Sequence, residues 1–395
     1  MKILFIAPLP PPVHGSAMVS QYIKDSKLVN ELHDCDFVNL STSRRMDEIG
    51  KGGIKKLLRF IGAYFAVFFK LLTRHYDLCY LAITCHDKGF LKDAPFVLLC
   101  KLFGRKVLIH QHNKGMSGCV HRWPYRWLLP LVYRNTKVML LSWHLYDDIV
   151  QVVKREQVVV CANGVPPLQA VGHWPLAVGS SEDDNGAAEL QANSQKPKAN
   201  SQALSANSQQ LKASLLFLSN LIESKGVYVL LDACKVLKER GLSFVCDFVG
   251  GETKEISAEV FREAVATRGL EGYVTYHGPQ YGEDKHRFFM NADVFVQPTF
   301  DDCFPLTLVE AMQYSLPIAS TDVGAIPDMV QDGVNGFVCG QQDVPSLVTA
   351  LEQLITDPAL RKQMGEAGYA RYKELYTLEA FEKCFVAQLA TESRC

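Results

Sequence analysis

The chain has 395 residues, which predicts two domains because a single hydrophobic core stops growing near roughly 250 to 300 residues. Its 41 Lys and Arg are balanced by 42 Asp and Glu, with no dense basic run, and this argues against nucleic acid as a partner. The 12 cysteines form no Cys-x-x-Cys pair and have no zinc-type His spacing, which favours reduced thiols in a cytoplasmic protein.

Short apolar runs alternate with longer helical patterns over residues 1–167. The opening apolar run is too short for a signal peptide and leads at once into prolines, so it is expected to be a first buried strand. Strands that are apolar on both faces, separated by helices, are typical of a parallel sheet covered on both sides. Residues 1–167 are therefore predicted to form a doubly wound α/β domain, with strands at 3–7, 78–83, 106–110, 138–141 and 158–161.

The segment 54–73 is the most hydrophobic part of this domain. Its apolar stretch Phe60–Phe69 follows Lys55, Lys56 and Arg59 and is far shorter than the about 20 apolar residues of a bilayer span. Two interpretations remain open. The segment is either a helix packed on the sheet, or a basic, aromatic-rich helix resting on an anionic membrane, which would place the protein at the inner face of that membrane.

Residues 168–212 differ in composition from the rest of the chain. They are rich in Ser, Asn, Gln and Ala, and the sequence Ala-Asn-Ser-Gln recurs at 192, 199 and 206. No pair of apolar positions is sustained through the seven-residue period, as a coiled coil would require. This composition predicts a disordered, duplicated insertion between two domains.

The α/β pattern starts again after the insertion and predicts a second doubly wound domain over residues 213–375. Its strands are expected at 215–218, 244–249, 274–277, 294–297 and 318–320, with a helix at 225–240. The last segment, 376–395, has apolar residues at 378, 381, 385, 386 and 389. This helical stripe is expected to cross back onto the first domain.

Two acids, Asp302 and Glu310, stand on either side of a Phe-Pro step that starts a helix. An acid in the loop before a helix can accept hydrogen bonds from hydroxyl groups, and the helix start offers unpaired amides and a positive dipole end to an anion. Glu310 lies about one and a half turns into the helix, within reach of a second diol of the same ligand. A sugar, a diphosphate and a ribose would suit such a site.

Ligands of parallel sheets gather at the carboxyl ends of the strands, which makes the loops after the strands informative. Gly15 permits close backbone approach after the first strand, and Ser16 is expected to be the N-cap of a helix that points its amides at a phosphate. After the third predicted strand, His112 is a candidate substrate contact, whereas His110 is expected to be structural.

The second domain offers similar loops. Lys225 stands at an expected helix start, where it either neutralises a diphosphate or is a solvated first-turn lysine. The backbones at Gly250 and His277 are candidates for lining a base pocket. The sequence Asp34-Cys35-Asp36 matches the Asp-x-Asp motif of metal-dependent transferases, but it precedes a strand, so we interpret it as chance and expect no bound Mn²⁺ or Mg²⁺.

Four motifs follow one another at residues 219–226, 292–298, 302–312 and 333–337. In this order they resemble the motifs of the retaining, nucleotide-sugar-dependent glycosyltransferases of the GT-B fold, specifically glycosyltransferase family 4. The resemblance extends over essentially the whole chain outside 168–212. It implies two Rossmann-like domains facing across a cleft, and transfer of a hexosyl unit from a nucleotide-diphosphate sugar to a saccharide or lipid-linked acceptor in surface polysaccharide or glycolipid synthesis.

The resemblance also implies roles for individual residues. Glu310 would bond the ribose, and Asp302 would bond the donor sugar near its anomeric carbon. Lys225 would hold the diphosphate, and His112 would lie beside the sugar and the acceptor. The remaining donor contacts would come from Gly15, Ser16 and the backbone of Phe304, Pro305 and Leu306.

Two residues depart from the family pattern. Asn220 stands where the family usually has Arg, and Asp302 stands where it usually has Glu. These departures leave open a non-catalytic protein that binds nucleotide sugars. A nucleotide-sugar epimerase also stays open, because it shares the two-domain fold.

Overall fold

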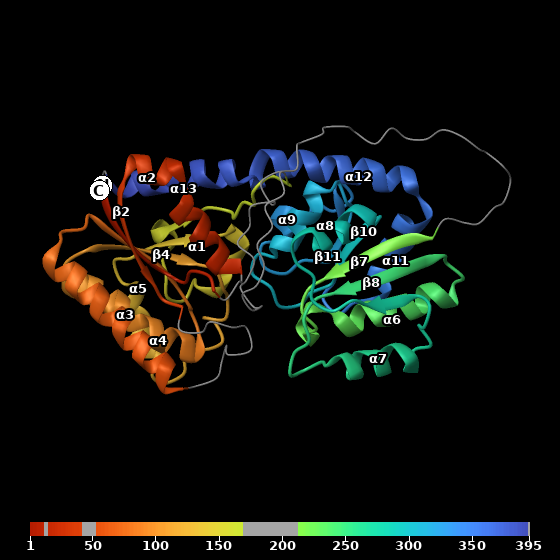
Figure 1. Ribbon diagram of the computed structural model, residues 1–395, viewed down its shortest axis with the longest axis horizontal. Helices are drawn as coiled ribbons and strands as arrows, with labels where there is room; N and C mark the ends of the chain where they lie inside the picture. Colours follow the sequence, from red (N-terminus) through yellow and green to blue (C-terminus); the bar gives the residue numbers. More distant parts are fainter. Residues whose placement is uncertain (12–14, 42–52, 169–211, 394–395) are drawn as a thin grey trace, which may run out of the picture.

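The computed structural model describes residues 1–11, 15–41, 53–168 and 212–393. They form two α/β halves that lie side by side along the long axis of the molecule, each built on a six-stranded sheet (Figure 1). The insertion predicted at 168–212 falls almost entirely outside the described residues, so its disorder stays a prediction.

The first sheet is parallel throughout, with strand order β2-β1-β3-β4-β5-β6. All five strands predicted for this half form, each within one residue of the expected ends, and Asp34 begins the sixth. The strands are β1 (Lys2–Ala7), β2 (Asp34–Asn39), β3 (Leu78–Ile83), β4 (Lys106–Gln111), β5 (Lys137–Leu140) and β6 (Val158–Val160).

Alternate residues of the strands feed two separate cores. Leu4 and Ile6 of β1 face a core that includes Val67 of α3, whereas Ile3 and Phe5 face a core shared with the C-terminal helix α13. This period of two is why each strand is apolar on both sides. The helices of this half are α1 (Gly15–Asp25), α2 (Lys27–Leu32), α3 (Ile54–Thr73), α4 (Asp87–Leu102) and α5 (Tyr125–Tyr133).

Asp36 of β2 anchors helix α3 to the sheet. Its carboxylate accepts hydrogen bonds from Lys70 Nζ at 2.7 Å, Arg74 Nη1 at 3.0 Å and the Tyr76 hydroxyl at 2.6 Å. Burial works to raise the pKa of Asp36, but the hydrogen bonds from Lys70, Tyr76 and Arg74 outweigh it and lower the pKa from 3.8 to about 2. The second acid of the Asp34-Cys35-Asp36 sequence therefore has a structural role.

We expect Asp36→Asn to destabilise the protein at neutral pH by roughly 2 to 3 kcal/mol, and this difference to shrink in acid. The folded-state pKa of Asp36 is depressed, so its contribution is complete above about pH 4 and is lost as the pH falls towards 2. Urea unfolding of the first domain at several pH values, in both proteins, measures the difference. A gap that stays constant between pH 5 and pH 2 would contradict the assignment.

The second sheet has strand order β12-β11-β10-β7-β8-β9 and is also parallel. Its five predicted strands form, and the residues after Asn335 add β12, which was expected only as part of a motif. The strands are β7 (Ala213–Leu218), β8 (Phe244–Val249), β9 (Val274–Tyr276), β10 (Val294–Gln297), β11 (Ile318–Thr321) and β12 (Gly336–Cys339).

Helices cover both faces of this sheet, and the predicted helix 225–240 forms with a later start, as α6. The helices are α6 (Val227–Glu239), α7 (Ala258–Thr267), α8 (Gly282–Asn291), α9 (Leu306–Gln313), α10 (Ile326–Met329), α11 (Val344–Thr356) and α12 (Pro358–Arg371).

The C-terminal helix α13 (Leu378–Ser393) crosses back onto the first domain, which confirms that prediction (Figure 1). Phe381, Phe385 and Leu389 are buried in the core around β1. The crossing is fixed at Gly164, where a Cβ atom would lie 2.3 Å from the Thr377 carbonyl oxygen. The close approach of the two backbones explains why glycine stands there.

Candidate functional site

The strand order of the second sheet brings two distant loops together. β7 and β10 are hydrogen-bonded neighbours although β8 and β9 lie between them in sequence. Strand order reverses direction at this point, and the carboxyl ends of the strands on either side of such a point form the usual ligand crevice of an open α/β sheet. The loop after β7 carries Lys225, and the loop after β10 carries Asp302.

Lys225 and Asp302 meet there as an ion pair. Lys225 Nζ donates to Asp302 Oδ2 at 2.7 Å and to the Asp301 carbonyl oxygen at 2.8 Å. The two side chains of the pair are 21% and 15% exposed, so the pair is well shielded but open to one side. Lys225, which is predicted to bind a diphosphate, is therefore paired in this structure with Asp302, which is predicted to bind the sugar.

The prediction that Lys225 begins a helix is wrong. Lys225 ends a short 3₁₀ turn (Glu223–Lys225), and α6 starts only after Gly226. Gly226 has φ of 85°, and a Cβ there would lie 2.1 Å from the Pro298 carbonyl oxygen. The left-handed conformation of Gly226 lets the loop after β7 lie directly against the loop after β10. This contact directs Lys225 towards Asp302.

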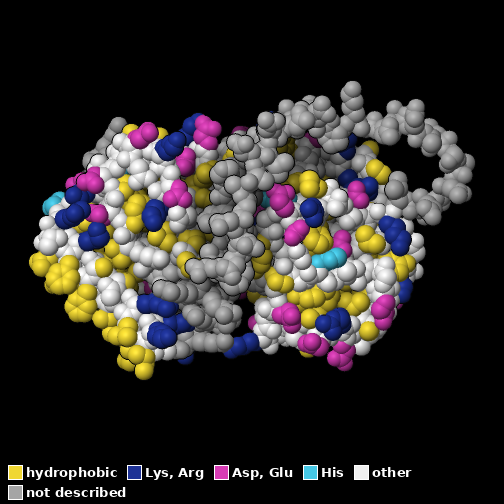
Figure 2. Space-filling model, in the orientation of Figure 1, with side chains coloured by type: hydrophobic (Ala, Val, Ile, Leu, Met, Phe, Trp, Pro, Cys, Tyr) yellow, Lys and Arg dark blue, Asp and Glu magenta, His cyan; other side chains and the backbone are white. Residues whose placement is uncertain are grey.

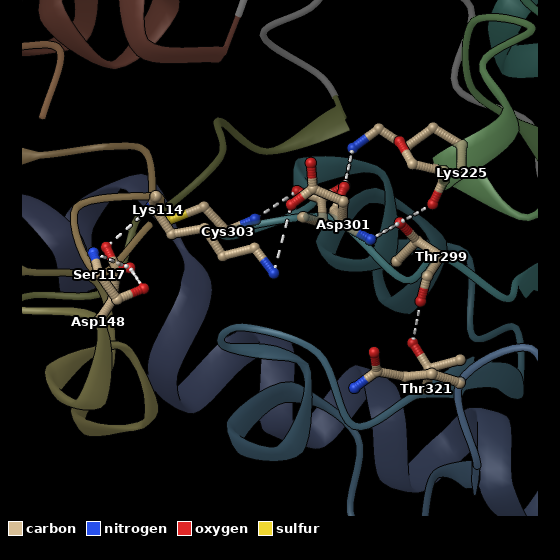
Figure 3. Close-up of polar contacts among 12 residues, drawn as sticks. Lys114, Ser117, Asp148, Lys225, Thr299, Asp301, Cys303 and Thr321 are labelled. Atoms are coloured by element: carbon tan, nitrogen blue, oxygen red, sulfur yellow. Dashed lines mark hydrogen bonds and ion pairs between the residues drawn. The ribbon is translucent and has the colours of Figure 1, made fainter. Parts of the chain in front are cut away.

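A second lysine reaches the same loop from the first domain. Lys114 follows β4, and its Nζ lies 3.3 Å from Asp301 Oδ1. Figure 3 shows Lys114 and Lys225 approaching the loop from opposite sides. The base of the loop is held by Thr299 Oγ1, which donates to the Ser224 carbonyl oxygen at 3.0 Å, and by Thr321 Oγ1, which donates to the Thr299 carbonyl oxygen.

Glu310 lies in the fifth position of α9, half-buried. Its Oε1 accepts from Lys285 Nζ of α8 at 2.7 Å, while Oε2 is buried and has no hydrogen-bond partner among the described residues. An orphaned buried carboxylate oxygen is costly, and a hydroxyl of a ligand would satisfy it. Burial, and then the nearby Glu310 carboxylate, raise the pKa of Tyr22 in α1 of the first domain, so the two domains face each other at this residue.

The first domain approaches the start of α9 at Gly15. A Cβ on Gly15 would lie 3.8 Å from Leu306 Cδ1, the first residue of that helix. Helix α1 begins at Gly15, so Ser16 lies within its first turn and the prediction of Ser16 as the N-cap is wrong. The amino-terminal ends of α1 and α9 therefore lie near one another, and both present a positive dipole end.

His112 follows β4, directly above a buried histidine. The ring centroids of His110 and His112 are 4.0 Å apart, and His110 Nδ1 shares a hydrogen bond of 2.7 Å with the Tyr80 hydroxyl. Burial, and then His112, lower the pKa of His110 well below its usual value. His110 is thus a neutral structural residue beneath the half-exposed ring of His112.

The three loops after β7, β8 and β9 are joined by hydrogen bonds. Asn220 Oδ1 accepts from the Gly251 amide at 3.0 Å, and the Gly250 amide donates to the Gly278 carbonyl oxygen at 2.9 Å. The His277 Nε2 atom lies 2.7 Å from Asp247 Oδ1. Asn220 therefore holds this edge of the domain together, a role that an arginine at this position would not fill in the same way.

Phe304 and Pro305 form the floor of the loop rather than its surface. Both side chains are buried, and the Phe304 ring lies against Tyr376 with a centroid distance of 6.1 Å. Leu306 is half-buried at the start of α9, facing Gly15. Asp302 Oδ1 also accepts from the Cys303 amide at 2.8 Å, which fixes the carboxylate just before the helix.

Sequence reasoning did not find three interactions: the Lys285–Glu310 pair, the Lys114–Asp301 pair and a hydrogen bond between Ser142 and Asp328. Lys285 belongs to no motif, and its pairing with Glu310 depends on how α8 packs beside α9. The Lys114–Asp301 pair joins the two domains, as does the hydrogen bond from Ser142 Oγ to Asp328. No group of three or more His, Cys, Asp or Glu side chains suited to a metal occurs within the described ranges.

The second half of the chain matches a known family in sequence. Residues 202–371 match the family described as glycosyl transferases group 1. The chain is 29% identical over 159 residues to an amylovoran biosynthesis glycosyltransferase of Erwinia amylovora, a match that covers 39% of this chain and 36% of that protein. It is 31% identical over 161 residues to a D-inositol 3-phosphate glycosyltransferase of Streptomyces griseus, covering 39% and 34%. The match thus spans little more than a third of each relative.

Solved structures resemble the whole chain in fold. A sucrose-phosphate synthase from Thermosynechococcus elongatus superposes with a TM-score of 0.69 at 17% identity, covering 99% of this chain and 98% of that one. HepE from Anabaena, solved in complex with UDP, superposes with a TM-score of 0.68 at 15% identity, covering 99% and 100%. The chain therefore has the GT-B fold of these structures, and its residues 202–371 are similar in sequence to the glycosyl transferases group 1 family.

Proposed function

We propose that this protein is a retaining glycosyltransferase that moves a hexosyl unit from a nucleotide-diphosphate sugar to a saccharide or lipid-linked acceptor. The observation that carries the proposal is the Lys225–Asp302 ion pair at the switch point of the second sheet. It puts a cation for a diphosphate and an acceptor for sugar hydroxyls within 2.7 Å of each other. That is the arrangement that a diphosphate-linked sugar needs at its anomeric end.

The chemistry follows from where charge develops. As the bond between the anomeric carbon and the diphosphate oxygen breaks, negative charge grows on the leaving group and positive charge on the sugar ring. Lys225 and the amides at the start of α9 would stabilise the diphosphate, and such preorganised groups act strongly where water is excluded. Asp302 would be released from Lys225 by the arriving diphosphate and would turn to the sugar hydroxyls.

Retention and independence from metal belong to the proposal. The cations Lys225 and Lys114 both lie at the loop 299–303, so two positive charges from different domains would face the diphosphate although Asn220 replaces the usual arginine. His112, above the neutral His110, would lie beside the sugar and the acceptor. Front-face attack, in which the leaving phosphate takes the acceptor's proton, retains the anomeric configuration without a protein nucleophile.

The natural task that we propose is assembly of a surface polysaccharide or glycolipid on the cytoplasmic side of a membrane. Two relatives, an amylovoran biosynthesis glycosyltransferase of Erwinia amylovora and a capsular polysaccharide biosynthesis glycosyltransferase of Staphylococcus aureus, support this choice. The eleven described cysteines are all free thiols, as expected in a reducing compartment.

A thermal-shift screen against UDP, GDP, ADP and their sugars tests donor binding, and one nucleotide is expected to raise the melting temperature. Incubation with that sugar nucleotide and acceptor, followed by NMR of the anomeric proton, should then show a product with the donor's configuration. An inverted product would overturn retention. Epimerised sugar nucleotide formed without acceptor would favour an epimerase, and binding without any hydrolysis or transfer would favour a non-catalytic protein.

A further inference from the structure

The outer face of helix α3 is apolar, although the helix is already packed on the sheet by its inner face. Seven large side chains of α3 are between 39% and 79% exposed, and they recur every three or four residues along one stripe. The opposite stripe, including Val67 and Leu71, is buried in the core. An ordinary surface helix is polar on its outer side, so this stripe needs a covering. The exposed stripe comprises Ile54, Leu57, Leu58, Ile61, Phe65, Phe69 and Leu72.

The apolar surface continues onto the neighbouring helices. α4 packs on α3 through Phe60–Phe96 and Phe68–Phe103 ring contacts, and it contacts α5 through Lys101 Nζ, which donates to the Leu131 carbonyl oxygen at 3.1 Å. The exposed side chains here are Leu102 of α4 at 81%, Trp127 and Leu131 of α5 at 68% and 54%, and Trp123, in the loop before α5, at 78%. We call this surface, with the α3 stripe, the apolar face. Figure 2 shows hydrophobic side chains gathered at the lower left, where Figure 1 places α3.

The charge of this part of the chain indicates what covers it. Residues 54–134 contain fourteen Lys and Arg but only three Asp and no Glu, although the whole chain is balanced at 41 against 42. Of the three acids, Asp93 is buried, Asp77 lies on the linker before β3, and Asp87 is paired with Arg122 at 3.3 Å. Lys55 and Arg126 are exposed at the margins of the apolar face. A surface that combines apolar side chains with a cationic margin matches an anionic lipid surface.

We propose that the apolar face docks on the surface of an anionic phospholipid bilayer. Phe65, Phe69 and Leu72 would enter the boundary between headgroups and acyl chains. Trp123 and Trp127 would lie at headgroup level, where indole rings concentrate. No helix among the described residues is long and apolar enough to cross a membrane. Because the inner face of α3 is packed on the sheet, the contact lies in the plane of the surface.

This docking deepens the proposed function by naming the surface on which a lipid-linked acceptor would be met. Helices of a doubly wound domain begin at the carboxyl edge of the sheet, so the amino-terminal ends of α3 and α5 lie at the same edge as His112 and Lys114. An acceptor headgroup at that membrane surface would stand beside these residues. The docking itself depends on the apolar face alone and does not require a donor.

The test is co-sedimentation of the full-length protein with vesicles. Phosphatidylcholine vesicles containing phosphatidylglycerol at about a third of the lipid are expected to bind the protein at least tenfold more tightly than pure phosphatidylcholine, and raised salt should weaken the binding. Tryptophan fluorescence should be quenched by lipids brominated on the acyl chain. The absence of binding at every anionic lipid content would overturn the proposal.

Matched variants assign the contact to the face. Phe65→Ser with Phe69→Ser is expected to lower vesicle affinity at least tenfold, whereas Val260→Ser with Met290→Ser, at similarly exposed apolar residues of the second domain, should leave it unchanged. A second pair isolates charge: Lys55→Glu with Arg126→Glu should remove the preference for anionic lipid, and Lys254→Glu with Lys362→Glu should not.

Two further measurements distinguish lipid docking from dimerisation, and lipid docking from the proposed transferase function. Light scattering of the protein without lipid should show no concentration-dependent dimer; a dimer that Phe65→Ser with Phe69→Ser dissociates would mean that a second copy covers the face, and would overturn the proposal. Nucleotide binding in solution should be the same in all these variants. Vesicle binding without nucleotide binding would leave the docking standing and would refute the proposed transferase function.

Discussion

Lys225→Met is expected to lower kcat/KM for glycosyl transfer by a factor of roughly 10² to 10³. The lysine is the charged group at the switch point of the second sheet, and removing one preorganised stabilising group from a developing anion typically costs that much. Because the leaving group carries its charge mainly in the transition state, kcat should fall more than nucleotide affinity. Initial rates with the donor sugar identified by the screen, together with nucleotide titrations, provide the measurement.

The control for this experiment is Lys254→Met, at an exposed lysine of the same domain. Losing Lys225 also leaves Asp302 without its cation in the unliganded protein, so the melting temperature of each variant is needed alongside the kinetics. Lys225→Arg should recover part of the rate, since it restores the charge with a different donor geometry. A Lys225→Met protein that is folded and works within threefold of the natural chain would remove Lys225 from the site.

Glu310→Gln is expected to weaken binding of the nucleoside diphosphate by a factor of roughly 10 to 100. Its Oε2 atom is buried and has no hydrogen-bond partner in the described part of the chain, while its Oε1 atom accepts from Lys285, so Oε2 is placed to accept from a ribose hydroxyl. A hydrogen bond to a charged acceptor contributes about 1.5 to 3 kcal/mol, which corresponds to this loss. Isothermal titration of the natural chain and the variant gives the difference.

A second ligand makes this test specific for the ribose. The 2′,3′-dideoxy form of the same nucleotide should bind the natural chain about as weakly as the ordinary nucleotide binds Glu310→Gln, and the variant should lose little more on changing ligand. Glu283→Gln, at an exposed acid of α8, is the matched control. Independent, additive losses from the variant and the dideoxy ligand would show that Glu310 does not contact the ribose.

Strands and helices could be predicted from the sequence where they depend on the pattern of apolar residues in a short segment. The ten predicted strands were short runs rich in apolar residues, and that pattern depends only on neighbouring residues, so all ten form. The crossing of α13 was predicted because its apolar residues form one helical stripe, which had to be buried against another part of the protein. β12 was missed as a strand because its four residues, Gly336–Cys339, begin with glycine, a residue that is depleted in strands.

Local backbone conformation explains the errors at the site. The helix predicted from Lys225 starts later because Gly226 adopts a left-handed conformation to fit beneath the Pro298 carbonyl, a contact between distant parts of the chain. The N-cap predicted at Ser16 was wrong because α1 begins at Gly15, and apolar periodicity does not fix a helix end to a single residue.

The sequence by itself determined the α/β class, the two parallel sheets and the loops after their strands in which a site had to lie, because periodicity and position after a strand are local properties. The tertiary structure decided which charges meet: Lys225 with Asp302, Lys285 with Glu310, and Lys114 with Asp301 across the domains. It also showed that segment 54–73 is a helix packed on the sheet, while leaving an apolar face exposed on which the membrane interpretation depends. The helix has two apolar faces, and only packing against the sheet could show that one is buried while the other is exposed.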